Sequence, residues 1–340
     1  MPELAFVVFE EERQKGRLSL AARYGLFRTT IGAALFHLFN KKKFRSGIIV
    51  IEIEVGIEIL LIKLPFPLSM LSALNKQYFE RHISRVYSAM GCRKCFVPVA
   101  ARRLGWLGQY SADTNSRSVI FKALLLPILD EIYTKSCLRL DNLDIAFVSG
   151  ENADELLTMV KQLEPHVRYI NVASSDKEYL GCELADICAD SGISIFTGSD
   201  FKNILRNADI IINLGKTDAI SKYRIRSRSL VINFFNRSSP ILHGEFTVIM
   251  GVEYTFPESR YDIFGEDIQR SFTRAELTDI WMASKAGLLN GGSYNETKAD
   301  LILSIFENNC CRITGFSGRR GVLRVGNVLK AIRERCKIPL

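Results

Sequence analysis

Short apolar runs alternate with segments of helical periodicity along the middle of the chain. Each run is rich in Val, Ile, Leu or Phe and is followed by glycine or polar residues. Such strands are typical of a parallel sheet covered by helices on both faces, and right-handed crossovers make that sheet doubly wound. The expected strands are Leu143–Ser149, Tyr169–Ala173, Ile193–Phe196, Ile210–Leu214 and Leu230–Phe235, and the expected helices between them are Ala153–Leu163, Leu180–Ala189 and Phe201–Asn207.

The residues before this region follow a different pattern. Leu4–Phe9 is a short apolar run, and over residues 51–59 isoleucine and valine alternate with Glu and Gly, which is the period of a strand. A helix is expected over Leu68–Met90 and another short strand over Cys95–Ala100. A further helix over Ser116–Thr134, kinked at Pro127, leads into the sheet.

The C-terminal part is mixed in character. Its expected elements are a strand over Phe246–Val252 and helices over Thr273–Ala286, Thr297–Asn308 and Gly321–Arg335. The whole pattern predicts three parts: a smaller N-terminal α/β domain (1–115), a doubly wound, Rossmann-like nucleotide-binding domain (116–240) and a mostly helical C-terminal segment that packs across both (241–340). A length of 340 residues agrees with about two domains.

Charge and composition narrow the partners. The formal net charge of +8 favours anionic partners, and the basic residues at 41–45 and 224–228 are more typical of a solvated face than of a specific nucleic-acid site. The most apolar early stretch, Ile31–Phe39, is too short to cross a membrane. We therefore expect a cytoplasmic protein without a transmembrane segment. Cys92 and Cys95 form a CxxC without a second pair at zinc spacing, so we expect buried thiols and no metal.

The strongest functional indication is a set of residues that follow the predicted strands. In doubly wound sheets, ligands bind outside the carboxyl ends of the strands. These small and polar residues are therefore candidates for contact with a nucleotide cofactor, NAD or NADP. The candidates are Gly150, Asn152, Ser174, Ser175, Asp176, Gly198, Asn213 and Gly215.

The order of parts resembles that of a two-domain NAD(P)-dependent dehydrogenase of the shikimate, amino-acid or methylenetetrahydrofolate dehydrogenase type. The text NADIIINLG, followed by SLVINFF, is similar to the fourth and fifth strands of the Rossmann domain in such enzymes. The resemblance covers Ser116–Phe235 and implies a catalytic N-terminal domain, a dinucleotide-binding domain and C-terminal helices that return to the first domain. It is a resemblance of architecture, and it identifies no specific family.

The turn after the first strand departs from that family. A dinucleotide fingerprint reads GxGxxG, because glycines let the backbone approach the pyrophosphate at a helix N-terminus. Here the sequence is Gly-Glu-Asn-Ala-Asp-Glu from Gly150, so only the first glycine is present. The acidic residues suit the helix N-terminus itself. Two interpretations stay open: a bound dinucleotide, with Asp176 as the partner of a ribose, or a Rossmann-like fold whose binding is lost or altered.

Other residues are candidates for catalysis or anion binding. His243, Lys216 and Lys76 are candidate acids or bases. The segment Gly315–Gly321 carries three glycines, Ser317 and two arginines, and we expect it to precede a helix. It is a candidate anion site, and the alternative is a surface turn with solvated arginines. Its proposed anion-binding residues are Ser317, Gly318, Arg319 and Arg320.

Three functions compete at this point. The first is an NAD(P)-dependent oxidoreductase acting on a small acidic metabolite, and the second is a non-catalytic nucleotide-binding or regulatory protein with the same fold. The third, binding to nucleic acid or a membrane surface through the basic N-terminal segment, ranks last because no nucleic-acid-binding motif accompanies it. The expected partners are a small anionic metabolite or nucleotide and, as a homodimer, a second copy of the chain.

Overall fold

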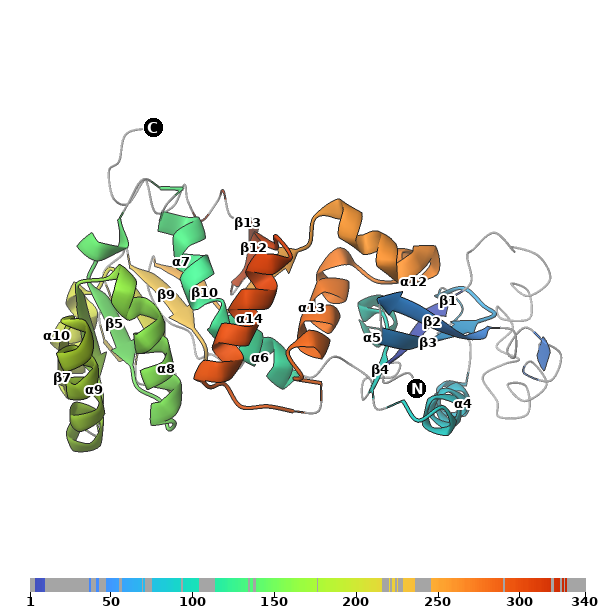
Figure 1. Cartoon of the computed structure of the whole chain (residues 1–340), viewed down its shortest axis with the longest axis horizontal. Coiled ribbons are helices and arrows are strands. Elements are labelled where there is room, and N and C mark those ends of the chain that lie inside the picture. Colours follow the sequence, from blue (N-terminus) through green and yellow to red (C-terminus); the bar gives the residue numbers. More distant parts are fainter. Residues whose placement is uncertain are drawn as a thin grey trace. The chain divides into compact units, whose positions relative to one another are not determined.

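The structure, a computed structural model, divides the chain into two compact units (Figure 1). Unit 1 comprises Met1–Asp113 and Phe256–Asn290, and unit 2 comprises Thr114–Thr255 and Gly291–Leu340. The residues described are 4–9, 37, 41–42, 47–54, 57–68, 70, 75–92, 94–103, 114–133, 135–136, 139–175, 177–215, 220, 222–223, 225, 229–235, 246–289, 291–318, 321–324, 326 and 328.

Unit 1 is built on a four-stranded sheet of order β2-β3-β1-β4. β1 is parallel to β3 and β4, whereas β2 is antiparallel to β3. The strands are β1 (Leu4–Phe9), β2 (Ile48–Glu54), β3 (Ile57–Leu64) and β4 (Lys94–Phe96), and the helices are α4 (Lys76–Ala89), α5 (Val99–Arg103), the 3-10 helix η6 (Glu258–Phe264), α12 (Gly265–Ser271) and α13 (Arg274–Lys285).

Alternate residues of β1 build two separate layers of the unit 1 core. Ala5 and Val7 belong to a buried cluster that includes Phe79 of α4. Phe6 is also fully buried, but its ring lies 5.3 Å from that of Phe272, which directly follows α12. Because successive side chains of a strand point to opposite faces, one strand holds α4 on one side of the sheet and the segment 256–290 on the other.

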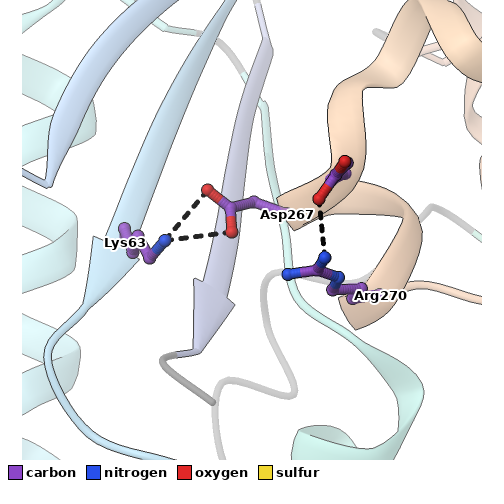
Figure 2. A network of polar contacts seen from close by, with 4 residues as sticks. Lys63, Asp267 and Arg270 are labelled. Atoms are coloured by element: carbon purple, nitrogen blue, oxygen red, sulfur yellow. Dashed lines mark hydrogen bonds and ion pairs between the residues drawn. The ribbon is translucent and has the colours of Figure 1, made fainter.

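Polar contacts join the same segment to the first 113 residues of the chain. Figure 2 shows Lys63 of β3 reaching Asp267 of α12, with nitrogen–oxygen distances of 2.9 and 3.0 Å. Glu276 of α13 is 6% exposed and accepts a hydrogen bond of 2.8 Å from the backbone nitrogen of Val99, at the start of α5. The same carboxylate accepts from the nitrogen and hydroxyl of Thr273, which completes a capping box.

Unit 2 contains a six-stranded sheet of order β10-β9-β8-β5-β6-β7, and every pairing in it is parallel. The prediction of a doubly wound parallel α/β sheet is confirmed. Its strands are β5 (Ile145–Val148), β6 (Tyr169–Ala173), β7 (Ser194–Gly198), β8 (Ile210–Asn213), β9 (Leu230–Asn233) and β10 (Thr247–Ile249), and its helices are α6 (Thr114–Ala123), α7 (Leu125–Tyr133), α8 (Ala153–Leu163), α9 (Lys177–Ser191), α10 (Phe201–Asn207) and α14 (Glu296–Asn308); the 3-10 helices are η4 (Leu140–Asn142) and η5 (Glu164–His166).

Local signals explain several of these boundaries. Asn152 caps α8 and Asp200 caps α10, each through its side chain. The single helix expected over 116–134 is two helices, interrupted at Leu124. Pro127 has no N–H with which to bond the carbonyl four residues earlier, so the interruption falls where the proline predicts a kink.

Unit 2 also carries a small antiparallel sheet, in which β11 (Gly251–Thr255), β12 (Arg312–Gly318) and β13 (Gly321–Arg324) lie in that order. The expectation that Gly321 begins a helix is wrong, because 321–324 pair with β12 as a hairpin. Gly321 has a φ of 110°, a backbone conformation that favours glycine. The expected strand over 246–252 is also two strands, one in each sheet.

Unit 1 brings two similar corrections. The alternating residues 51–59 belong to two antiparallel strands, β2 and β3, rather than one. The helix expected from Leu68 begins at Lys76, after the side-chain cap of Asn75, and the apolar run from Cys95 ends as a strand at Phe96 because α5 begins at Val99. Periodicity located these elements, whereas tertiary pairing and caps set their ends.

Candidate functional site

The strand order of the large sheet defines the place where a ligand is expected. Numbered along the chain from β5 to β10, the strands lie in the order 3-2-1-4-5-6, which is that of the dinucleotide-binding Rossmann fold. The order reverses between β5 and β8, and ligands bind outside the carboxyl ends of the strands at such a switch point. The sequence-predicted residues at the ends of β5, β6, β7 and β8 therefore share one edge, called the carboxyl edge here.

Gly150 and Gly215 lie at the switch point, and the protein's own backbone explains both. A Cβ on Gly150 would lie 2.5 Å from the carbonyl oxygen of Leu214, and a Cβ on Gly215 would lie 2.6 Å from the carbonyl oxygen of Ser149. Contacts this short require the backbone to shift. Each glycine is thus required by the close approach of the two strand ends, whether or not a ligand is bound.

A buried pair of amides fixes the turn after β8. Asn213 is 0% exposed and donates from Nδ2 to Oδ1 of Asn233, the last residue of β9, over 2.7 Å. The Oδ1 atom of Asn213 accepts from the backbone nitrogen of Gly215 over 3.2 Å. Both polar atoms of the Asn213 side-chain amide are therefore hydrogen-bonded within the protein. Its predicted contact with a cofactor is not tested by this arrangement, and Asn233 is a residue that the sequence reasoning did not select.

Serine side chains link the ends of the first two strands. The hydroxyl oxygens of Ser149 and Ser174 lie 2.9 Å apart, and Ser174 is 1% exposed, with its backbone nitrogen bonded to the carbonyl of Gly198. Ser175, the next residue, is exposed at the same edge. Asp176, the candidate ribose partner, lies outside the described residues.

The first turn of α8 is acidic, as the sequence indicates, and one of its charges is neutralised. Glu155 accepts from Lys122 of α6 over 2.5 Å, in a pair whose side chains are 22% and 12% exposed. Asn152 stands at the second glycine position of the fingerprint and is the helix cap. Asp154 is exposed. Side chains therefore stand at positions where the fingerprint has glycines and a pyrophosphate would approach the backbone. The backbone N–H groups of this turn still lie at a helix N-terminus.

The structure describes one of the three candidate catalytic residues, so whether the three lie together stays a prediction. Lys76 is the first residue of α4 in unit 1. Lys216 and His243 lie outside the described residues. Ser317 and Gly318 of the predicted anion site end β12, and the glycine is explained by packing, because a Cβ there would lie 2.7 Å from the side chain of Leu323.

Arg319 and Arg320 lie outside the described residues, and the segment that follows them, Gly321–Arg324, is a strand rather than a helix. Their role in anion binding therefore stays a prediction.

Two marked pKa shifts involve aromatic side chains inside the units. Burial lowers the pKa of His82 in unit 1 to about 4, aided by the nearby positive charges of His37 and Arg85. Burial also raises the pKa of Tyr294 in unit 2, whose hydroxyl donates to Gln162 over 3.0 Å. Cys92 and Cys95 are buried, and burial raises the pKa of both thiols. Cys92, Cys95 and Tyr294 are parts of the buried core, whereas His82 is half-buried.

Among the described residues, no group of three or more His, Cys, Asp or Glu side chains is placed to hold a metal ion. No helix in the described part of the chain is long and apolar enough to cross a membrane. Neither finding changes the choice of the carboxyl edge as the candidate site.

No protein-family model matches the sequence, and no curated protein matches it significantly. Solved structures similar to parts of the chain include Δ1-pyrroline-2-carboxylate reductase of Thermococcus litoralis in complex with NADH and L-proline, at 14% identity and a TM-score of 0.25 over 34% of this chain and 35% of that one. Another is the iminosuccinate reductase of Paracoccus denitrificans in complex with NAD⁺, at 11% identity and a TM-score of 0.26 over 35% and 36%.

A longer alignment is with L-tryptophan dehydrogenase of Nostoc punctiforme, at 11% identity and a TM-score of 0.27 over 99% of this chain and 89% of that one. The chain spans about a third of the length of the first two reductases. All three TM-scores lie far below the level of a shared whole-chain fold. The class of the protein, a Rossmann-like α/β protein, therefore rests on the strand order of its own sheet.

Proposed function

We propose that unit 2 binds a dinucleotide, NAD or NADP, at the carboxyl edge, and that the protein is an NAD(P)-dependent oxidoreductase acting on a small anionic metabolite. The observation that carries the proposal is the 3-2-1-4-5-6 order of an all-parallel sheet. At its switch point the backbone turns of Gly150 and Gly215 meet. The exposed Ser175 and the adjacent Asp176 stand after β6, the strand whose end holds a ribose in such folds.

The preference for an anionic substrate rests on charge. The chain carries a formal net charge of +8. Arg319 and Arg320 are the proposed partners of the acidic group, because two guanidiniums bind a carboxylate through charge-assisted hydrogen bonds. His243, Lys216 and Lys76 are the proposed acids or bases.

A second function is favoured by a specific observation. Asn152 and Glu155 occupy the second and third glycine positions of the fingerprint, and Glu155 is held by Lys122. A turn of this kind disfavours the pyrophosphate of a dinucleotide and tolerates a ligand with fewer phosphates. The alternative is therefore a non-catalytic protein that binds a mononucleotide or nucleoside at the same edge.

A matched pair of variants tests where the ligand binds. Ser175→Trp puts a large ring at the carboxyl edge, whereas Ser194→Trp puts the same ring at the opposite end of the sheet, where Ser194 is exposed at the start of β7. Calorimetric titration with NADH, NADPH and AMP is the measurement. We expect Ser175→Trp to weaken binding at least tenfold and Ser194→Trp to leave it within about twofold.

Turnover separates the two functions. The protein is mixed with NADH or NADPH and a panel of 2-oxo acids, with and without ammonium, and loss of the reduced nicotinamide absorbance is followed. Steady-state turnover supports the oxidoreductase. If AMP binds while neither dinucleotide binds and no turnover is seen, the result supports the non-catalytic alternative. If none of the three nucleotides binds, both functions are refuted.

A further inference from the structure

An exposed aromatic ring lies on β7, the edge strand of the six-stranded sheet. Phe196 is the third residue of β7 and is 51% exposed. The strand pairing aligns it with Asn171 of β6 and, through that residue, with Ala146 of β5. Ala146 belongs to the core cluster that contains Ile204 of α10, so Phe196 lies on the face of the sheet that α10 covers. A phenylalanine in such a position is normally buried.

The ring of Phe196 leans toward the carboxyl edge. A Cβ on Gly198, two residues along the strand, would lie 2.8 Å from Cε1 of Phe196 and 3.4 Å from Cδ1 of Ile204. The ring therefore lies over the glycine, and any larger residue at 198 would displace it. Gly198 ends β7, so the ring lies beside the end of the strand.

The ring stays in contact with solvent at the edge of the sheet. β7 is the edge strand, and the seven-residue helix α10 packs over its neighbour β6. The exposed hydroxyls of Ser175 and Ser199 follow β6 and β7 at the same edge. An aromatic face on a strand whose carboxyl edge also carries hydroxyl groups is suited to a flat heterocycle with hydrogen-bonding edges.

The place of the ring in the fold decides which part of a ligand it meets. A Rossmann sheet consists of two mononucleotide-binding halves, and the first is formed here by β5, β6 and β7 with their helices. We propose that Phe196 is the stacking surface for the nucleobase of the nucleotide half that binds over β5, β6 and β7, which in NAD or NADP is adenine. This inference rests on the proposed function, and it makes Phe196 a residue that sets preference for the base.

Two substitutions of Phe196 test the stacking. Phe196→Leu keeps an apolar side chain and removes the flat face, and the exposure of the position leaves the fold intact. Base–aromatic stacking is worth about 1–3 kcal/mol, so the Kd for NADH and for ADP-ribose rises at least about fivefold. Phe196→Trp keeps both affinities, and the new indole fluorescence is quenched when ADP-ribose binds.

Tyr169→Leu is the matched control. Tyr169 is 39% exposed on the same face of the sheet, because it pairs in register with Ser194 at the start of β7. It stands at the amino end of β6, away from the carboxyl edge. We expect NADH and ADP-ribose affinities within about twofold of the unmodified protein, and Tm values for all three variants close to the unmodified one.

The outcomes separate this inference from the proposed function. If the unmodified protein binds none of NADH, NADPH and ADP-ribose, the proposed function and the inference both fail. If it binds NADH and Phe196→Leu binds NADH and ADP-ribose equally well, the inference alone is overturned. Light scattering adds a further outcome: a Phe196→Leu variant with a smaller oligomer and unchanged affinity would show that the ring meets a second copy of the chain, which also overturns the inference.

Discussion

Adding one methyl group at Gly150 is expected to destabilise unit 2. The Cβ of Gly150→Ala would lie 2.5 Å from the carbonyl oxygen and 3.1 Å from the carbonyl carbon of Leu214. Both atoms are backbone at the end of a central strand, so the strain cannot be relieved by a side-chain rotation. Overpacking of this kind costs typically about 1–3 kcal/mol. For a unit of this size that corresponds to a fall in Tm of roughly 3–10 °C.

Gly181 provides the matched control, because the same substitution there should change the Tm in the opposite direction. It lies within α9, and a Cβ there would meet no atom within 4 Å. Alanine is favoured over glycine in a helix by about 0.5–1 kcal/mol, so Gly181→Ala should raise the Tm. The same chemical change thus lowers stability at one position and raises it at the other.

Differential scanning calorimetry of the three proteins is the assay. The reasoning is refuted if Gly150→Ala melts within 1 °C of the unmodified protein or above it. The result also bears on function, because loss of nucleotide binding in a Gly150 variant would then report strain in the sheet. Ser175→Trp is the cleaner probe of the site, since Ser175 is exposed.

Three further predictions concern unit 1. Glu276→Gln should lower the free energy of unfolding by about 1–3 kcal/mol in urea titrations, because the buried carboxylate accepts from Val99 and Thr273; an unchanged value would contradict this role. Lys63→Met should change the free energy of unfolding by less than about 1 kcal/mol, because both side chains of the Lys63–Asp267 ion pair are over a third exposed. A larger loss would contradict this small contribution. The pKa of His82 is lower in the folded protein than in the unfolded chain, so the unfolded chain takes up this proton at a higher pH. The free energy of unfolding should therefore fall as the pH drops from about 6.5 toward 4. His82→Gln should flatten that fall in melts followed against pH, and a profile of unchanged slope would contradict the assignment.

The elements that the sequence predicts best are those with a local signal at each end. The bounds of α8 and α10 match the expected ones, since Asn152 and Asp200 cap them through side chains next to the first helical residue. β1 and β6 also match, because their apolar runs are bounded by polar or basic residues. For these segments local chemistry and tertiary packing agree.

The errors fall where a distant strand decides the conformation. Residues 321–324 show a helix-like pattern, but they pair with β12, and this pairing depends on a turn at Gly321 that periodicity does not reveal. The division between β2 and β3 has the same origin, because one alternating pattern suits one long strand or two antiparallel ones equally well.

The sequence predicted where the candidate site lies, but few of the contacts that its residues make. Residues after consecutive parallel strands share one edge for geometrical reasons, so the sequence located the carboxyl edge. The partners of those residues come from elsewhere: Ser149 meets Ser174 across two strands, and Lys122 of α6 holds Glu155 of α8. No spacing in the sequence marks such pairs, because their members lie on separate elements.

The two glycines at the switch point show why a motif and its function must be argued separately. In the fingerprint, a glycine after the first strand is attributed to the tight turn and to the approach of a pyrophosphate. Here the carbonyl oxygens of Leu214 and Ser149 already occupy the space that side chains at Gly150 and Gly215 would need. The fold alone therefore retains both glycines, and their presence does not distinguish a binding protein from a non-binding one. The discriminating residues are those that the fold does not require in their present form: Ser175 at the edge, and the exposed ring of Phe196.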